Sequence, residues 1–307
     1  MDLSGPRLDV LVTGASGLVG TELCTRLSGA GHRVRRLVRR APTSPDELRW
    51  DPAAGELGVE ALEGTDAVVH LAGENIAGRR WTRAQKERLV RSRVEGTRLL
   101  AEKVQSATRK PAVLIAASAA GYYGDRGDEV LTESSEGGVG FLAELCQHWE
   151  AETHGIEGVR TVQLRLGLVL SSRGGALAKM LLPFRLGLGG RIGNGQHWMS
   201  WLSIDDAVGT VHHILNTEAL SGPVNAVSPE PTTNRTFTRT LGRALSRPTV
   251  LPLPAFVARI AFGELADALL ASHRVVPERL LETGYRFEHP NLEGALRHLL
   301  GRGTHPE

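Results

Sequence analysis

Residues 10–20, VLVTGASGLVG, join the pattern of a short apolar strand to the start of a helical pattern. The β-branched run at residues 8–13 is bounded by glycine and predicts a buried strand. The spacing of Leu23 and Leu27 predicts a helix over residues 21–30. The turn between them has the spacing G-x-x-G-x-x-G. A strand before such a turn and a helix after it are the context in which proteins bind a dinucleotide.

Each glycine of this turn has its own physical role. Gly14 permits a tight strand-to-helix turn, Gly17 lets the backbone approach a pyrophosphate, and Gly20 lets the helix pack close to the sheet. The N–H groups at the helix N-terminus then bind the phosphates. The alternative is a purely structural turn. On the binding interpretation, the expected cofactor contacts are Gly14, Ser16, Gly17, Leu18, Val19 and Gly20.

Strand and helix patterns alternate along the first half of the chain. Helices are predicted over residues 81–103 and 141–153. Apolar runs predict further strands at residues 34–38, 66–72, 112–117 and 161–170. This alternation predicts the α/β class, with a Rossmann-type doubly wound parallel sheet covered by helices on both faces.

The pattern becomes mixed after about residue 170, with a glycine-rich loop and proline-punctuated helices. We therefore expect an NADP-binding Rossmann domain over residues 1–170. A smaller, mixed substrate-side region is expected over residues 171–307, including a C-terminal helical domain at about residues 250–302.

Composition restricts the partners that we expect. The 36 Lys and Arg residues and 34 Asp and Glu residues leave a formal net charge of +2, which suggests neither nucleic acid nor membrane. No apolar run reaches the roughly 18 residues of a membrane span. Two cysteines, Cys24 and Cys146, fit a reducing compartment. We expect a cytoplasmic protein that acts on a small-molecule substrate.

Two arginines follow the second predicted strand, where they bear on the choice of cofactor. An acidic residue at this position binds the ribose hydroxyls of NAD, whereas arginine suits the 2′-phosphate of NADP. Arg39 and Arg40 therefore favour NADP. The alternative is a solvated basic strand end, because Arg33, Arg35 and Arg36 lie close by in the sequence.

Several long motifs resemble the extended short-chain dehydrogenase/reductase superfamily, and more closely its atypical branch of "epimerase family proteins", sometimes called SulA-like. They are HLAGENIAGRRWTRAQKERLVRSRVEGT (residues 70–97), SAAGYYGD (118–125), CQHWE (146–150), LLPFRLGLGGRIGNGQHWMSWLSIDD (181–206) and PERLLETGYRF (277–287). The last resembles the small C-terminal domain of that branch. This resemblance implies further cofactor contacts at Leu71, Ala72, Gly73, Lys86, Ser92 and Arg165. From its sequence alone, Lys86 would be a solvated helix charge. A structural ion pair would equally satisfy Arg165, whose charge lies in an apolar strand.

The resemblance fails at the catalytic pair. The superfamily uses a tyrosine and a lysine four residues later, but the aligned positions hold Leu142 and Cys146. Candidates for handling the proton are Ser118, Tyr122 and Tyr123. Alternatively, the tyrosines only wall the cofactor site. Cys146 is interpreted as a buried, inert cysteine, with a reactive thiol as the alternative.

Other residues are interpreted as structural or remain open. No histidine pair has the short spacing of a zinc motif, so no metal is expected. His70 fits a core histidine, and Asp205 and Asp206 fit helix caps. Trp198 and Trp201 fit either a substrate pocket or a packed interface.

Two functions remain open at this point. The first is an NADP-dependent oxidoreductase or epimerase-like enzyme of unknown substrate, and the second is a non-catalytic NADP(H)-binding sensor or regulator. By resemblance, a homodimer would form through the helices predicted at residues 81–103 and 141–153.

Overall fold

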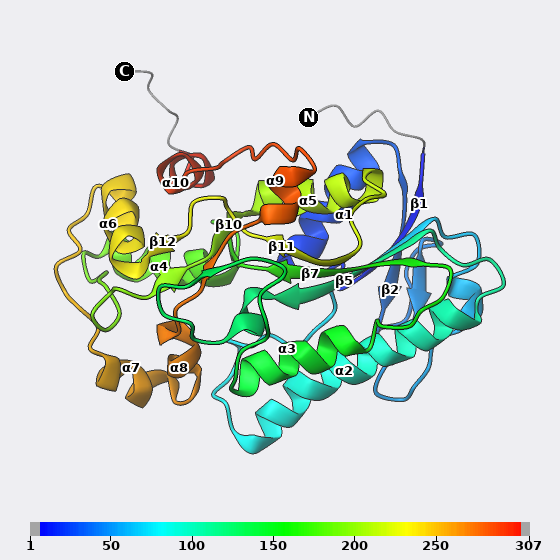
Figure 1. Ribbon diagram of the computed structural model, residues 1–307, viewed down its shortest axis with the longest axis horizontal. Coiled ribbons are helices and arrows are strands. Elements are labelled where there is room, and N and C mark those ends of the chain that lie inside the picture. The colour runs from blue at the N-terminus through cyan, green and yellow to red at the C-terminus, as the bar shows by residue number, and fades with distance from the viewer. Residues whose placement is uncertain (1–6, 302–307) are drawn as a thin grey trace. The chain divides into compact units, whose positions relative to one another are not determined.

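A computed structural model describes residues 7–301. Its central sheet has seven strands in the order β3-β2-β1-β4-β5-β7-β11 (Figure 1). These strands are β1 (Asp9–Thr13), β2 (Arg33–Val38), β3 (Glu47–Arg49), β4 (Ala67–His70), β5 (Val113–Ala119), β7 (Arg160–Leu166) and β11 (Gly222–Ala226). Each neighbouring pair from β3 to β5 is parallel. The Rossmann-type fold that the sequence predicts is confirmed.

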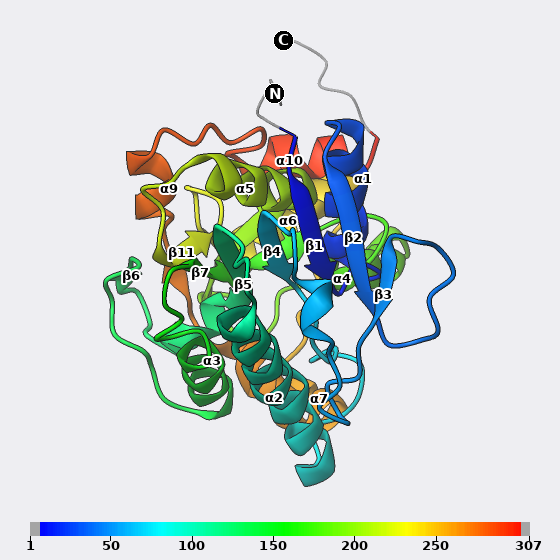
Figure 2. The ribbon, with the colours of Figure 1, turned by 90° about the vertical axis from the view of Figure 1, so that its right-hand side faces the viewer.

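The order of the strands reverses beside β1. The chain runs outward from β1 through β2 to β3, and then returns to β4 on the other side of β1 (Figure 2). In an open α/β sheet, ligands bind outside the carboxyl ends of the strands at such a switch point. The glycine turn follows β1, so the fold places it at the switch point.

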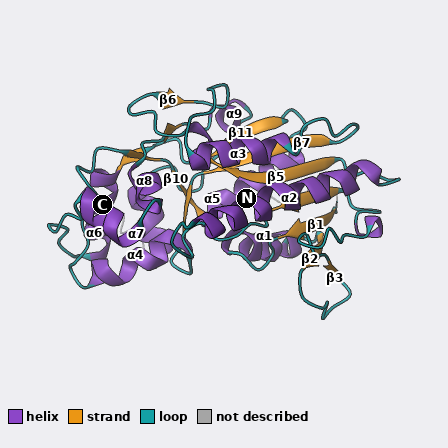
Figure 3. Cartoon of the chain, turned by 90° about the horizontal axis from the view of Figure 1, so that it is seen from below, coloured by secondary structure: helices purple, strands orange, loops and turns teal. Residues whose placement is uncertain are grey.

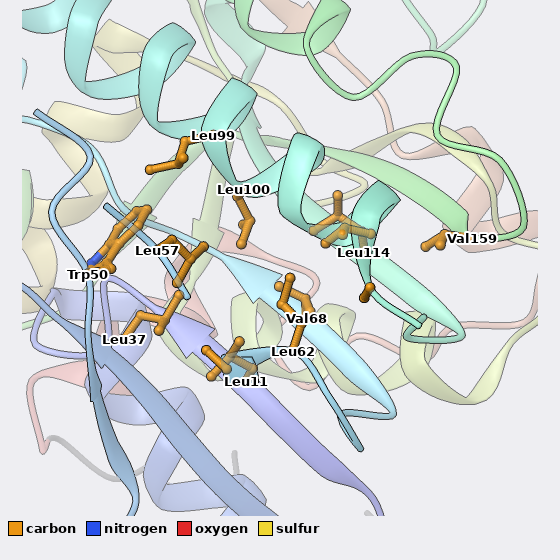
Figure 4. Packing of buried hydrophobic residues seen from close by; sticks show 13 residues of the cluster. Leu11, Leu37, Trp50, Leu57, Leu62, Val68, Leu99, Leu100, Leu114 and Val159 are labelled. Carbon is orange, nitrogen blue, oxygen red and sulfur yellow. The ribbon is translucent and has the colours of Figure 1, made fainter. Parts of the chain in front are cut away.

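Helices α1 (Leu18–Gly29) and α2 (Arg83–Ser106) lie on opposite faces of the sheet (Figure 3). On the α2 face, Leu99 and Leu100 pack among strand side chains that include Leu11 and Leu114 (Figure 4). Full burial of such a side chain stabilises the fold by about 1.5–3 kcal/mol. Side chains of a strand alternate between its two faces. Val10 and Val12, the buried residues on either side of Leu11, therefore point to the α1 face.

The contacts between residues divide the chain into two compact units. Unit 1 contains the residues up to Ser118, Leu145–Leu164 and Thr210–Val224. Unit 2 contains Ala119–Glu144, Arg165–Gly209 and the residues from Asn225 onward. Each unit is thus assembled from segments far apart in the sequence. The predicted domain boundary at residue 170 remains a prediction.

In unit 2, a second core forms between helices. Helices α4 (Gly175–Arg185) and α6 (Asn234–Leu245) lie side by side, and α10 (Leu292–Leu299) packs on α6 (Figure 1). Trp201 and Phe237 are fully buried in this core. The remaining elements are η1 (Val59–Ala61), η2 (Ala120–Tyr123), β6 (Val130–Leu131), α3 (Phe141–Ala151), β8 (Leu168–Leu170), β9 (Trp198–Met199), β10 (Trp201–Ser203), α5 (Ile204–Asn216), β12 (Thr232–Thr233), α7 (Ala255–Phe262), α8 (Leu265–Leu270), β13 (Arg274–Val275) and α9 (Glu278–Glu282).

The single strand predicted over residues 161–170 is wrong, because the structure divides it at Gly167. The N–H of Gly167 donates to Ala226 O at 3.0 Å, while that of Leu168 donates to Ser200 O at 2.8 Å. A side chain at Gly167 would lie 2.6 Å from Ser200 O. The backbones approach so closely there that β8 leaves the main sheet and pairs with β10 instead.

The other long predicted elements exist with shifted ends. Strand β4 stops at His70, so Leu71 and Ala72 follow the strand and do not end it. Strand β3 was not predicted, because three residues are too few to show an alternation of polar and apolar side chains. Across residues 7–301, no helix is both long and apolar enough to cross a bilayer.

Candidate functional site

The glycine turn of unit 1 lies against the chain that leaves β4. Gly14 has φ +66°, and a Cβ there would lie 2.7 Å from both the carbonyl carbon and the oxygen of Leu71. A Cβ on Gly20 would overlap the carbonyl oxygen of Gly14. Only glycine fits at either position. The turn, Leu71 and Ala72 are therefore brought together, and their contacts with a cofactor remain predictions.

The start of α1 is open to an anion. Its N-cap is Gly17, which offers no side-chain cap, and no acidic residue occupies its first turn. The first N–H groups of a helix have no partner within the helix, and the helix dipole makes that end positive. Ser16 and Gly17 are exposed beside them. A turn of this shape and charge fits a pyrophosphate.

A line of hydrogen bonds fixes the strand ends on either side of the turn. The Thr13 hydroxyl accepts the N–H groups of Leu71 and Ala72, both at 3.1 Å, and lies 2.7 Å from His70 Nδ1. Since that oxygen already accepts twice, its proton goes to Nδ1, and Nε2 keeps its own proton. Nε2 lies 2.9 Å from the Thr97 hydroxyl. His70 is the satisfied core histidine that its apolar strand predicts.

Burial lowers the pKa of His70 to about 4. The imidazole is therefore neutral in the folded chain, whereas it titrates near 6.5 when unfolded. A lowered pKa stabilises the fold above the unfolded value, and this stability is lost as the pH falls from about 6.5 to about 4. We expect His70 to account for about 3 kcal/mol of the acid-induced loss. Urea denaturation of the wild type and His70→Asn at about pH 7 and about pH 4 measures it. Equal losses in both proteins would contradict the expectation.

The two arginines after β2 differ in their surroundings. Arg40 forms a two-pronged ion pair with Glu47, at 2.6 Å and 2.9 Å, and also donates to Ala41 O at 2.9 Å. This guanidinium and the Thr43 N–H lower the pKa of Glu47 to about 2. Arg39 is exposed, and its side chain has no polar partner among residues 7–301. Only Arg39 thus presents an unengaged guanidinium.

Helix α2 holds the loop that follows Ala72. The Ser92 hydroxyl accepts the Glu74 N–H at 3.0 Å, and Arg93 donates to Glu74 O at 2.9 Å. The guanidinium of Arg93 also lies beside Gly73, where a Cβ would be 3.3 Å from Cζ. Lys86 is half-buried near the start of the same helix. Ser92 and Gly73 are thus brought together; the cofactor contacts of Ser92 and Lys86 remain predictions.

Ser118 is the second-last residue of β5, and its hydroxyl is already engaged in a hydrogen bond. It donates to Glu150 Oε1 at 2.6 Å, and both side chains are buried. Cys146 lies one helical turn before Glu150 on α3. Its side chain is 4% exposed, which favours the interpretation of this thiol as inert. Burial lowers the pKa of nearby Arg93.

The tyrosines and Arg165 meet in unit 2. The Tyr123 hydroxyl donates to Asn225 Oδ1 at 2.7 Å and accepts from Arg165 Nη1 at 2.9 Å. Burial raises the pKa of Tyr123 to about 12. The Arg165 guanidinium lies over the ring of Tyr122, with Cζ 3.5 Å from the centroid. The Tyr122 hydroxyl makes no hydrogen bond to any residue that the structure describes.

Asn225, Glu133 and Arg93 were missed by sequence reasoning. Asn225 could have been found because a polar side chain inside an apolar strand needs a partner, which is the argument made for Arg165. Its N–H donates to Glu133 Oε1 at 3.0 Å, and burial raises the pKa of this carboxyl. Glu133 follows a two-residue strand and carries no sequence signal.

Trp201 is a core residue, and the indole of Trp198 donates to Asp128 at 2.7 Å.

A glycine turn at the switch point of a parallel sheet is the arrangement of a dinucleotide-binding Rossmann fold. Residues 10–226 match the NAD dependent epimerase/dehydratase family, and residues 253–299 match a domain of unknown function (DUF1731). The chain belongs to this family, in the branch of epimerase family proteins that the motifs indicate.

Relatives cover almost the whole chain. Epimerase family protein MT2273 of Mycobacterium tuberculosis (strain CDC 1551 / Oshkosh) is 46% identical over 290 residues, 94% of this chain and 96% of that protein. The crystal structure of human epimerase family protein SDR39U1 (isoform 2) with NADPH has a TM-score of 0.88 and 37% identity, over 96% of this chain and 99% of that chain. The nucleoside-diphosphate sugar epimerase of Corynebacterium glutamicum has a TM-score of 0.80 and 38% identity, over 96% of this chain and 58% of that one.

Proposed function

We propose that the chain is an NADP(H)-dependent oxidoreductase or epimerase-like enzyme of the extended short-chain dehydrogenase type. The observation that carries the proposal is the glycine turn, where the space a Cβ would fill on Gly14 and Gly20 is closed by backbone. The NADPH that accompanies the human relative supports the choice of nucleotide. The residues that would hold it are Gly14, Ser16, Gly17, Leu18, Val19, Gly20, Arg39, Leu71, Ala72, Gly73, Lys86, Ser92 and Arg165.

Within this proposal, Arg39 binds the 2′-phosphate and Arg40 shapes the loop that carries it. Both side chains are exposed, but Arg40 is paired with Glu47 and Thr43, whereas Arg39 has no polar partner among the described residues. A guanidinium and a phosphate form two charge-assisted hydrogen bonds, each stronger than a neutral one. The acidic side chain that would favour NAD is replaced here by a basic one.

Arg39→Ala should weaken NADPH binding about 10- to 100-fold and leave NADH binding unchanged, because only NADPH carries the 2′-phosphate. Titration of the purified protein with both nucleotides, followed by fluorescence, measures this change. Arg109→Ala is the matched control, since Arg109 is an exposed arginine that precedes β5, at the opposite end of the strands. Equal losses for NADPH and NADH would assign Arg39 a general role in folding or charge.

The residues of this chain would supply the proton chemistry. A nicotinamide held there would supply the hydride chemistry. Tyr122 is the better of the two candidate acids, since its hydroxyl has no partner among the described residues and Arg165 lies over its ring. The cation stabilises a phenolate that has lost its proton to substrate. The Tyr123 hydroxyl accepts a hydrogen bond from Arg165 and so helps to hold the guanidinium in place. The raised pKa of Tyr123 disfavours it as the acid. Ser118, paired with Glu150, would hold a substrate oxygen.

A non-catalytic NADP(H)-binding sensor or regulator is the second candidate function. It is favoured by Leu142 and Cys146, which stand where the superfamily's tyrosine and lysine would be. Steady-state hydride exchange between NADPH and a panel of carbonyl compounds separates the two functions. Turnover that Tyr122→Phe abolishes supports the enzyme. NADPH binding without turnover of any compound supports the sensor.

A further inference from the structure

Three potential metal ligands from distant parts of the sequence meet within unit 2. Asp205 lies in the first turn of α5, His289 precedes α10, and His298 lies in the last turn of α10. Asp205 Oδ2 is 3.3 Å from His298 Nε2 and 4.0 Å from His289 Nε2. Potential ligand atoms on all three residues lie within 4.8 Å of one another.

The two imidazoles are stacked, with ring centroids 4.3 Å apart and an angle of 29° between planes. Both present Nε2 to the same carboxylate oxygen. The Nε2 of His289 is buried and makes no hydrogen bond within the described chain. A buried polar atom left in this way costs stability. One cation bound between the three side chains would give Nε2 of His289 a partner and would lie beside the negative charge of Asp205.

The backbone around this group is fixed independently of any ion. Asp206, the next residue along α5, accepts the N–H groups of Glu288 and His289 at 2.7 Å and 3.0 Å. The Ser228 hydroxyl donates to Pro290 O at 2.7 Å. Contacts of this kind hold ligand side chains in place before the ion arrives and raise its affinity.

We propose that Asp205, His289 and His298 form a zinc site, which nothing in the family comparison assigns. Two imidazoles and one carboxylate suit zinc, whereas calcium and magnesium prefer oxygen ligands alone. Ligands about 2.0–2.2 Å from a tetrahedral zinc lie about 3.3–3.6 Å apart, so Asp205 and His298 already have the required spacing. The 4.0 Å between Asp205 and His289, and the distance between the two histidine nitrogens, which is within 4.8 Å, close when the stacked imidazoles turn so that both Nε2 atoms face the ion.

The site has a route for entry and an open position. The His298 side chain is 54% exposed, while those of Asp205 and His289 are 14% and 17% exposed. A zinc ion held there would keep water as its fourth ligand. Since α5 and α10 supply the ligands, the ion would tie the C-terminal helix to α5. The sequence did not predict this site because residues 205 and 289 lie far apart along the chain.

The test uses the full chain after treatment with a chelator and its removal. Added zinc should be retained at one ion per chain after gel filtration, and should raise the melting temperature where magnesium does not. Cobalt in the same site should give the strong visible absorption of a tetrahedral ion.

Matched variants decide whether these three residues bind the ion. His298→Ala should weaken zinc binding at least about tenfold and abolish the cobalt absorption. Asp205→Asn, which keeps the shape of the side chain, should also weaken it. His148→Ala, an exposed histidine on α3, should bind zinc like the wild type. The proposal is overturned if the wild type retains no zinc, or if His298→Ala retains as much as the wild type.

Discussion

Gly20→Ala should abolish measurable NADPH binding and lower the free energy of unfolding by about 3 kcal/mol. The added Cβ would overlap the carbonyl oxygen of Gly14 and lie 2.9 Å from the Cα of Ala15. These are backbone atoms, which cannot rotate away, so helix α1 must move off the turn. The N–H groups at the start of α1 would then no longer point toward the pyrophosphate of the nucleotide. Loss of even one or two charge-assisted hydrogen bonds weakens binding about 10- to 100-fold.

Gly29→Ala provides the matched control on the same helix. Gly29 is exposed at the end of α1, and a Cβ there would meet no atom within 4 Å. Alanine favours helix over glycine, so this variant should equal the wild type or gain up to about 1 kcal/mol. Urea denaturation and NADPH titration of both variants make the comparison. If Gly20→Ala binds NADPH as tightly as Gly29→Ala, the turn is structural and the proposed function loses its main support.

Asp206→Ala should lower the free energy of unfolding by about 3–5 kcal/mol. The carboxylate is fully buried and accepts from Ser203 Oγ at 2.7 Å and from the Tyr285 hydroxyl at 3.2 Å. It also accepts the backbone N–H groups of Glu288 and His289. Alanine leaves these donors without an acceptor in the interior. In addition, the Ser203 hydroxyl accepts the N–H of Asp206 at 2.9 Å, as an N-cap side chain does at the start of a helix.

The size of this loss is judged against another aspartate of unit 2. Asp267 is 65% exposed and pairs with Arg259 at 3.1 Å. Exposed ion pairs contribute little, so Asp267→Ala should cost less than about 1 kcal/mol. Urea denaturation at neutral pH measures both variants. Similar losses at the two positions would show that Asp206 does not anchor the segment before α10.

The parts of this protein that sequence predicts well are those encoded within a few neighbouring residues. The glycine turn, the strand before it and the helix after it all follow from residues 8–30. His70 could be assigned to the core because its neighbours on the strand are all apolar. Asp206 was expected to cap the N–H groups of its helix, but its carboxylate accepts those of Glu288 and His289 instead, while Ser203 caps α5.

What the sequence could not predict depends on partners far away along the chain. Arg39 and Arg40 look equivalent until folding brings Glu47 to one of them. Tyr122 and Tyr123 are likewise adjacent, but only Tyr123 reaches Asn225. The break at Gly167 depends on the carbonyl of Ser200, which approaches from another strand. In each case, tertiary contact decides between residues that local pattern treats alike.

Within the proposed enzymatic function, the burial of Tyr123 and His70 has a consequence for the dependence of turnover on pH. Their pKa values, about 12 and about 4, lie on either side of the neutral range, so neither group changes its charge there. A bell-shaped dependence of turnover on pH reports groups that gain or lose a proton within the range assayed. A limb of such a curve near neutrality would therefore come from other groups of the enzyme or from the substrate. A pH profile measured near neutrality would therefore report the reacting groups without a contribution from Tyr123 or His70.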